Sequence, residues 1–387
     1  MIRILLQELL SFNSIPFYAE IVSANYSGTY KVTILVFIMV DEHRATLTYT
    51  QLLKEDLGIF RLVPEDEVVP DFKAGQFLTL KQIIKGEEIR RSYSLCSTPK
   101  SGQFKIVVKQ IPNGKFSNFA NKEIKPGDQI ETGPPRGNFF VETNPNNAKS
   151  YTLIAAGSGI TPIFSILKSI LTEEPNSTIN LFYGNKSPEL TIFKEEIDQL
   201  NKKYSEKLTV NFIYSKCKGE SRFHTGRLEG RKLNKLFKKF APAKSTDEVF
   251  ICGPQEMTNR IITLLENKFS FNASNIHYEL FTADTVEKKS SQKKIRGSST
   301  ATAILNGETI EFIIKKNESI LEAGLAAGHD IQFSCQGGVC GVCKCMVGEG
   351  KVEMEVNDGL SDEELENGYI LCCQSFPRSE KITIEID

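Results

Sequence analysis

The sequence of 387 residues contains no tryptophan, no long apolar run and no excess of either charge. Its longest unbroken apolar run covers residues 34–40. Such a run is far too short to cross a bilayer, which needs about 20 apolar residues. The 47 lysines and arginines nearly balance the 48 aspartates and glutamates, so no overall basic field favours nucleic acid or an anionic membrane. An apolar share of 40% and a charged share of 25% are typical of a globular protein.

The first ten residues lack the features of a signal peptide. Arg3, Gln7 and Glu8 interrupt them, and no small-residue cleavage site follows. We therefore expect a protein of the reducing cytoplasm. There, nine cysteines indicate metal or redox chemistry rather than a disulfide scaffold, and six of the nine lie between Cys335 and Cys373.

The chain divides into stretches of different pattern. Residues 44–145 predict short strands separated by turns, which is typical of an antiparallel β-barrel. Residues 146–283 alternate buried strands with helices, which predicts an α/β domain with a parallel sheet. Residues 284–300 are polar and basic, as in a linker. Residues 301–387 combine an Asn-Gly hairpin signal with a helix, and residues 1–43 form an N-terminal extension of unknown role.

The cysteine spacing is the strongest chemical signal. Cys335, Cys340 and Cys343 follow the plant-type [2Fe–2S] pattern C-x4-C-x2-C, and Cys373 lies further along the chain. A glycine-rich loop can supply three thiolates to the two irons, and a distant segment the fourth. A structural zinc site is the alternative, but zinc usually takes paired C-x2–4-C hooks. Neighbouring residues on a strand point in opposite directions, so we expect only one of Cys372 and Cys373 to reach the cluster.

Two segments around these cysteines carry a family resemblance. Residues 334–343, SCQGGVCGVC, resemble the cluster loop of plant-type ferredoxins, and residues 369–377, YILCCQSFP, are similar to their closing segment. The resemblance implies a β-grasp domain that holds a [2Fe–2S] cluster. It also selects Cys373 as the fourth ligand.

A strand-borne tetrapeptide, Arg91-Ser92-Tyr93-Ser94, suits a flavin nucleotide. Strand alternation predicts Arg91 and Tyr93 on one face and Ser92 and Ser94 on the other. A cation can bind a pyrophosphate, an aromatic ring can stack on a ring system, and a hydroxyl can hydrogen-bond a ring nitrogen. An ordinary exposed strand face is the alternative.

Three further motifs sit at predicted turns. Residues 114–117, GKFS, can open a helix whose free N–H groups suit a phosphate, or can form a plain loop with a capping serine. Residues 157–162, GSGITP, join a buried strand to a helix, as a dinucleotide-binding turn does, although they lack the full G-x-G-x-x-G. Cys252 ends a strand where α/β sheets bind ligands, or is a small buried apolar residue.

These four motifs, in this order, resemble the ferredoxin–NADP reductase family over about residues 44–283. The resemblance implies an FAD-binding barrel followed by an NAD(P)-binding α/β domain. The residues that it implies at FAD are Arg91, Tyr93, Ser94, Gly114, Phe116, Ser117 and Phe281. Those that it implies at the nicotinamide dinucleotide are Gly157, Gly159 and Thr161. Those that it implies beside the reacting rings, in catalytic positions, are Ser94, Cys252 and Glu279.

The choice between NADPH and NADH depends on a short segment after a predicted strand. Ser215 and Lys216 are similar to the family's 2′-phosphate site, and Arg222 and Lys186 can assist. A hydroxyl with cations favours a phosphate, and hence NADPH. Solvated surface charges are the alternative.

The order of the modules narrows the resemblance. A reductase followed by a ferredoxin, with the motifs at residues 90–94, 222–228 and 276–281, resembles the reductase subunits of phenylacetyl-CoA epoxidase systems. The resemblance implies an enzyme that passes electrons from NADPH through FAD and the cluster to an oxygenase. A general ferredoxin- or flavodoxin-type reductase for another acceptor is the alternative enzyme. A binding module with degenerate sites is the alternative outside the enzymes.

Overall fold

The computed structural model describes residues 43–54, 57–64, 69–125, 127–218, 221–228, 230–240, 245–281, 298–305 and 307–386. By its contacts the chain divides into residues 1–42 and one unit from His43 to Asp387. The expected extension therefore lies outside the described residues except for His43. The expected linker does so up to residue 297.

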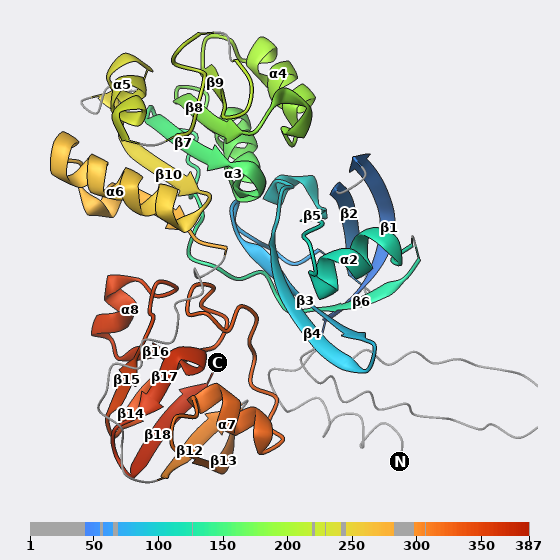
Figure 1. Ribbon diagram of the computed structural model, residues 1–387, viewed down its shortest axis with the longest axis vertical. Coiled ribbons are helices and arrows are strands. Elements are labelled where there is room, and N and C mark those ends of the chain that lie inside the picture. Colours follow the sequence, from blue (N-terminus) through green and yellow to red (C-terminus); the bar gives the residue numbers. More distant parts are fainter. Residues whose placement is uncertain are drawn as a thin grey trace, which may run out of the picture. The chain divides into compact units, whose positions relative to one another are not determined.

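The first sheet has six antiparallel strands in the order β4-β3-β6-β1-β2-β5. Helix α2 (Lys115–Lys122) lies against it (Figure 1). The buried Phe116 and Ala120 of this helix belong to the core of the sheet. The strands are β1 (His43–Lys54), β2 (Leu57–Pro64), β3 (Phe77–Ile84), β4 (Glu87–Ser94), β5 (Phe104–Lys109) and β6 (Gln129–Thr132). Their core contains Phe60, Leu62, Leu78, Phe104 and Ile106.

The closed barrel expected here is not confirmed by the strand order. Between the outer strands β4 and β5 the described residues form one isolated bridge, from Leu95 to Ile106, rather than a ladder. Leu95 is the first residue after β4, so the outer strands meet only where β4 ends. Among the described residues, the sheet therefore has no continuous ladder of hydrogen bonds between its two outer strands.

The second sheet is parallel, with the strand order β11-β10-β7-β8-β9. Its strands are β7 (Ser150–Ala156), β8 (Thr178–Asn185), β9 (Leu208–Tyr214), β10 (Glu248–Cys252) and β11 (Ile276–Glu279). Its helices are α3 (Ile160–Glu173), α4 (Lys194–Lys203), α5 (Gly230–Phe240) and α6 (Gln255–Phe269).

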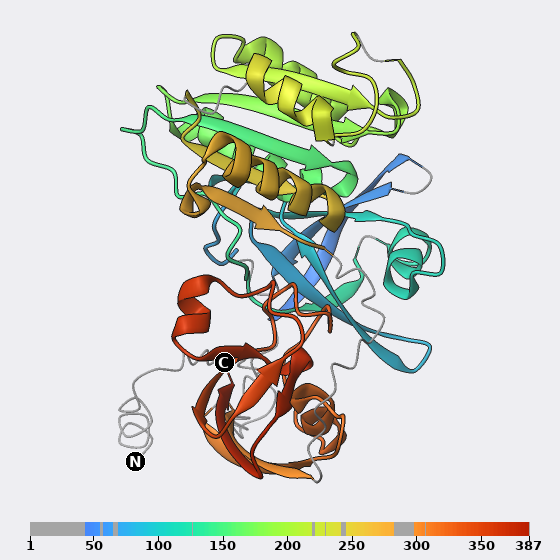
Figure 2. The same cartoon turned by 60° about the vertical axis from the view of Figure 1, so that its left-hand side comes forward.

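Alternate residues of the buried strand β7 explain this arrangement. Leu153 packs with apolar side chains of α3 and α4, whereas its neighbour Ile154 packs with those of α5 and α6. Successive strand residues point to opposite faces, so each face of the sheet carries its own pair of helices. Figure 2 shows helices on both faces. The parallel sheet confirms the α/β domain expected from the alternating pattern.

The third sheet has the order β13-β12-β18-β14-β16 and belongs to the C-terminal β-grasp domain. Strands β12 and β18 are parallel, and the other pairs are antiparallel. Its strands are β12 (Ser299–Leu305), β13 (Glu308–Ile314), β14 (Lys344–Glu349), β16 (Tyr369–Leu371) and β18 (Lys381–Ile386). A separate pair is β15 (Val352–Met354) and β17 (Ser375–Pro377), and the helices are α7 (Ile320–Ala326) and α8 (Asp362–Glu366).

Helix α7 begins with a capping box. The Ser319 hydroxyl accepts a hydrogen bond from the backbone N–H of Glu322, whose carboxylate accepts one from the backbone N–H of Ser319. Its buried residues Ile320 and Leu321 pack into the core of the third sheet. Among the described residues, no helix is both long and apolar enough to cross a membrane.

Candidate active site

The two serines of strand β4 point to the same face of the sheet. Ser92 and Ser94 both line a cavity, whereas Tyr93 packs into the core of the first sheet. Arg91 was expected on the face of Tyr93, but it also lines the cavity. The reason is that its side chain turns back along the strand, where the guanidinium donates to the backbone oxygen of Arg90 at 2.6 Å. Arg91 nevertheless pairs with Leu80 and Tyr93 pairs with Leu78, and both leucines belong to one core, so the two residues leave β4 on the same face as expected.

The turn before α2 gathers the residues expected at the FAD phosphates. Gly114 is the residue that precedes the helix. Phe116 is buried, and its ring centroid lies 5.4 Å from that of Tyr93. Ser117 is also buried, and its hydroxyl accepts a hydrogen bond from the backbone N–H of Ile111 at 3.3 Å. Ser117 thus also holds the turn itself together.

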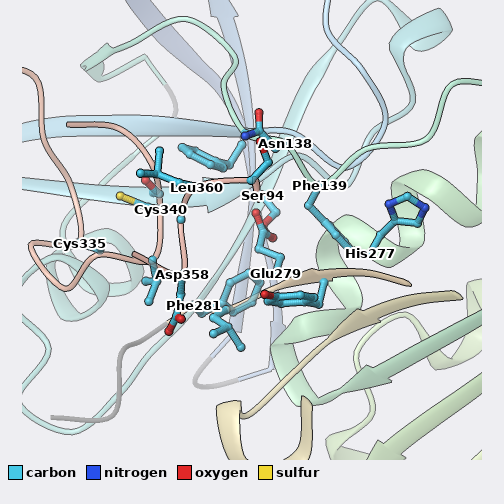
Figure 3. A pocket seen from close by; sticks show the side chains of 18 of the residues that line it. Ser94, Asn138, Phe139, His277, Glu279, Phe281, Cys335, Cys340, Asp358 and Leu360 are labelled. Atoms are coloured by element: carbon cyan, nitrogen blue, oxygen red, sulfur yellow. The ribbon is translucent and has the colours of Figure 1, made fainter. Parts of the chain in front are cut away.

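The cavity beside β4 has a volume of about 460 Å³. Figure 3 shows Ser94 of β4 next to Glu279, the last residue of β11, with Phe281 nearby and with Cys335 and Cys340 of the cluster loop on the same cavity. The first three residues are the ones expected at the flavin rings, and the two cysteines are expected cluster ligands. The fold therefore brings the predicted flavin site and the predicted cluster site to one cavity.

Glu279 is the unusual acid of this cavity. The Ser94 hydroxyl donates to its Oε2 at 3.2 Å. Burial raises the pKa of Glu279 to about 8, and the hydrogen bond from Ser94 opposes that rise. The carboxyl group is therefore largely protonated at neutral pH and can release its proton slightly above neutral pH. A shifted pKa of this kind is common at functional sites.

A short turn joins β7 to α3 at the carboxyl end of the parallel sheet. Gly159 lies so close to the end of β10 that a Cβ there would be 2.2 Å from the backbone oxygen of Cys252. Gly157 faces open space, and the Thr161 hydroxyl donates to the backbone oxygen of Ser158 at 3.0 Å. The three residues expected at the dinucleotide therefore share one turn.

Cys252 lies directly behind that turn. Its side chain is fully buried, and burial raises the pKa of the thiol well above its ordinary value. It is therefore a neutral side chain at the sheet edge where α/β proteins bind ligands. The described structure places it next to Gly159 rather than on the cavity wall.

The segment after β9 carries the residues expected at a 2′-phosphate. Ser215, Lys216 and Arg222 are all exposed. The backbone N–H of Ser215 donates to the oxygen of Asn185, which ends β8, at 2.9 Å. A bridge from Tyr214 to Thr225 holds the segment that contains Arg222 beside the end of β9. Two exposed cations, Lys216 and Arg222, thus lie in the segment that follows β9, the last strand in the order of the parallel sheet.

The four expected cluster ligands form two pairs. The Cys335 and Cys340 thiols interact with each other, and the Cys343 and Cys373 thiols form the second pair. Among the described residues no single point gathers three potential metal ligands. Two pairs are nevertheless the arrangement that a [2Fe–2S] cluster needs, since each iron takes two protein ligands.

Backbone N–H groups of the cluster loop also point at the sulfurs. The N–H of Gly337 donates to Cys335 Sγ at 3.3 Å, and that of Cys373 lies 3.5 Å from Cys343 Sγ. Gly338 has a φ of +76°, and a Cβ there would lie 2.8 Å from the backbone oxygen of Val356, so only glycine suits this tight turn. Four thiols, donors directed at the sulfurs and a turn that admits only glycine fit the cluster.

The choice between Cys372 and Cys373 has a different physical basis from the one expected. Residues 372–374 form a 3-10 turn, not a strand, so strand alternation does not apply. Instead, Cys372 Sγ lies 3.0 Å from Cys345 Sγ in the core, and Cys373 turns to Cys343. Cys373 is therefore the one of the two that faces the cluster loop.

Sequence reasoning missed the contacts that join residues 44–145 to residues 301–387. Arg90 bonds Asp330 across 240 positions of sequence. Asn138 similarly bonds Glu364. Neither pair belongs to a motif, and no signal in a single sequence links residues so far apart.

Comparisons with known proteins agree with this arrangement. The chain matches the oxidoreductase FAD-binding domain family over residues 44–141 and the oxidoreductase NAD-binding domain family over residues 153–262. It matches the 2Fe-2S iron-sulfur cluster binding domain family over residues 303–378.

Relatives align with this chain over most of its length. One subunit of the 1,2-phenylacetyl-CoA epoxidase of Escherichia coli is 36% identical over 317 residues, which cover 82% of this chain and 89% of that protein. The ferredoxin reductase component of the 3-ketosteroid-9-alpha-monooxygenase of Rhodococcus rhodochrous is 34% identical over 323 residues, which cover 81% and 88%. The structure of phthalate dioxygenase reductase is similar with a TM-score of 0.55 and 25% identity, over 88% of this chain and 97% of that one. The chain therefore belongs to the ferredoxin–NADP reductase family, among the oxidoreductases whose FAD- and NAD-binding domains are followed by a 2Fe–2S domain.

Proposed function

We propose that this oxidoreductase takes a hydride from NADPH or NADH and delivers electrons one at a time to an oxygenase, of the kind that phenylacetyl-CoA epoxidase represents. One observation carries the proposal: Ser94 and Glu279 share a cavity with Cys335 and Cys340. A flavin held there would lie beside the cluster. The similarity to proteins of two oxygenase systems supports the nature of the acceptor.

The residues divide among three groups in this proposal. FAD would be held by Arg91, Tyr93, Ser94, Gly114, Phe116, Ser117 and Phe281. The nicotinamide dinucleotide would be held by Gly157, Gly159 and Thr161. The cluster would be held by Cys335, Cys340, Cys343 and Cys373. When bound, FAD takes up the two electrons of a hydride and the cluster carries one electron at a time, so together they convert a two-electron donor into a one-electron donor.

The chain itself would supply placement and a proton site. Ser94 Oγ donates to Glu279 Oε2 and so fixes the carboxyl group at the cavity wall. Because the pKa of Glu279 is raised to about 8, this group can hold a proton at neutral pH and release it above that range. Cys252 would act from behind Gly159 as a neutral, space-filling neighbour of the nicotinamide site.

Three further assignments accompany this proposal. Exposed Ser215, Lys216 and Arg222 support NADPH as the donor, because a hydroxyl and two cations suit a 2′-phosphate. The domain boundaries that we propose are residues 44–145 for FAD, 146–283 for NAD(P) and 301–387 for the cluster, with a linker at 284–300. We also propose that the protein works in the cytoplasm, where a reducing environment keeps cysteine ligands available.

The test is a visible absorption spectrum of the anaerobically purified protein before and after NADPH is added. We expect flavin bands and broad iron–sulfur absorption, both bleached by NADPH, followed by recovery when an oxidised oxygenase is supplied. A folded, colourless protein after FAD, iron and sulfide have been supplied would refute the proposal. Bleaching by NADH at least as readily as by NADPH would refute only the choice of donor.

A further inference from the structure

Arg90 is a buried cation at the contact between β4 and the C-terminal domain. Its side chain is only 3% exposed. The guanidinium donates from Nη2 to Asp330 Oδ1 at 2.5 Å and from Nε to Glu88 Oε1 at 2.8 Å. It also reaches Gln332 Oε1 at 3.4 Å and lies 4.9 Å from the centre of the Phe333 ring. One side chain of the FAD-binding domain thus engages three residues that come just before the cluster loop.

A second contact lies two residues further along the same strand. The Ser92 hydroxyl donates to Ser334 Oγ at 2.8 Å, and Ser92 also contacts Thr79 Oγ1 at 3.2 Å. Ser334 is buried and directly precedes the cluster ligand Cys335. We call residues 330–334 the docking segment. Arg90 and Ser92 of β4 together contact four of its five residues.

A third contact lies beyond the last cysteine of the loop. Asn138 donates to Glu364 Oε2 at 3.0 Å, and Glu364 Oε1 accepts from Lys344 Nζ at 2.7 Å. Lys344 directly follows the ligand Cys343. The cluster loop is therefore held by the FAD-binding domain on both sides, just before its first cysteine and, through Glu364, just after its third.

The burial of the charged groups determines which of these contacts contributes most to holding the docking segment. Exposed ion pairs contribute little, since water and salt screen them. A buried arginine is different, because the loss of its carboxylate partners leaves an uncompensated charge in a low-dielectric site. The planar guanidinium also fixes direction as well as distance, which a flexible ammonium does not. Arg90 thus holds the docking segment in one geometry.

We propose that Arg90 is a positioning residue that sets the cluster loop against the flavin cavity for electron transfer within the chain. Among the described residues, the partners of Arg90 do not include a cysteine, and its side chain does not line the cavity. It acts through the docking segment, which fixes where Cys335 lies. The inference rests on the proposed electron path from flavin to cluster.

The experiment compares full-length holoprotein variants by anaerobic stopped-flow absorption after mixing with NADPH. Arg90→Gln and Asp330→Asn each remove one side of the pair, and Asp330 is half exposed, which makes its variant the milder one. Arg378→Gln is the matched control. Arg378 pairs with Glu353 at 2.5 Å inside the C-terminal domain, and Glu353 is as exposed as Asp330. FAD and iron content are measured for every variant.

We expect flavin bleaching by NADPH at the wild-type rate and cluster bleaching slowed several-fold in both test variants but not in the control. The double variant should be no slower than Arg90→Gln alone, since the pair acts as a unit. Hydrogen–deuterium exchange should rise in peptides that contain the docking segment. Arg90→Lys should restore the rate only partly.

Two outcomes would overturn the proposal. One is cluster bleaching in Asp330→Asn and Arg90→Lys as fast as in Arg378→Gln. The other is slowed bleaching with unchanged exchange of the docking segment. A wild-type protein whose flavin bleaches while its cluster never does would instead refute the electron path itself. That result is distinguishable because it appears before any substitution is made.

Discussion

Ser94 and Glu279 come from strands of two different sheets, and their hydrogen bond joins β4 to β11. Ser94 was predicted from the chemistry of its strand motif, and Glu279 was implied by the family resemblance. The raised pKa of Glu279 was not predictable, since it depends on burial by neighbours distant in sequence. At the residue scale, the sequence therefore indicates which side chains lie at the site, whereas packing determines their protonation state.

Glu279→Gln should remove a pH dependence of stability. The native pKa of about 8 lies above the ordinary carboxyl value of 4.5, so the native state keeps a proton that the unfolded state releases. Stability from this group is fully present below about pH 4.5, declines as the pH rises and is lost by about pH 8. We expect the unfolding temperature of the wild type minus that of the variant to be smallest at high pH. A pH-independent difference would contradict the assignment.

Cys373→Ser should abolish the cluster while Cys372→Ser should not. Cys373 faces Cys343 in the loop, whereas Cys372 contacts Cys345 in the core. A [2Fe–2S] centre holds two irons, so iron should fall from about two per chain toward zero in the first variant and stay near two in the second. FAD content should be the same in both, which separates loss of the cluster from general misfolding. Retention of iron by Cys373→Ser would show that another thiol completes the site.

At the scale of elements, the long periodic segments were predictable and the short ones were not. The strands and helices of the α/β domain follow runs of apolar residues, so the alternation predicted for residues 146–283 is found in β7, α3 and β8. The four-residue strand β6 and the five-residue helix α8 carry too few residues to show a period. The absence of a hydrogen-bonded ladder between the described strands β4 and β5 was not predictable for another reason. Whether a sheet closes into a barrel depends on the geometry of all its strands together.

The turn between β7 and α3 gives a prediction at this scale. In Gly159→Ala the new methyl group would meet backbone atoms of Cys252 and Gly253, which cannot rotate away, so we expect a loss of about 1–3 kcal/mol. Gly157→Ala meets no atom but must adopt a φ of +56°, which costs roughly 1–2 kcal/mol. Urea unfolding should rank both variants below the wild type. Only Gly159→Ala should also expose Cys252 to a thiol reagent in the native state.

At the scale of the whole chain, the sequence predicts the three domains but not how they meet within residues 43–387. Arg90 and Asp330 belong to no shared motif, and Ser92 and Ser334 belong to two separate motifs that do not predict their contact. Contacts of this kind depend on surface shape, which one sequence does not encode in any local pattern. The common cavity is a property of the folded chain, and under the proposed function it would make flavin-to-cluster transfer an event within one molecule.

Cluster reduction by NADPH should therefore be first order and independent of protein concentration. Groups tethered in one chain meet at an effective concentration of roughly millimolar, so collisions between molecules at micromolar concentration add little. Single-turnover absorption traces at increasing dilution should superimpose after scaling, whereas the rate of electron delivery to an added acceptor should rise with the acceptor's concentration. A rate constant that falls in proportion to dilution would mean that each cluster is reduced by the flavin of another chain. The contacts of Arg90 and Ser92 would then be structural only, because a docking segment positions its own cluster and has no effect on one that arrives by collision.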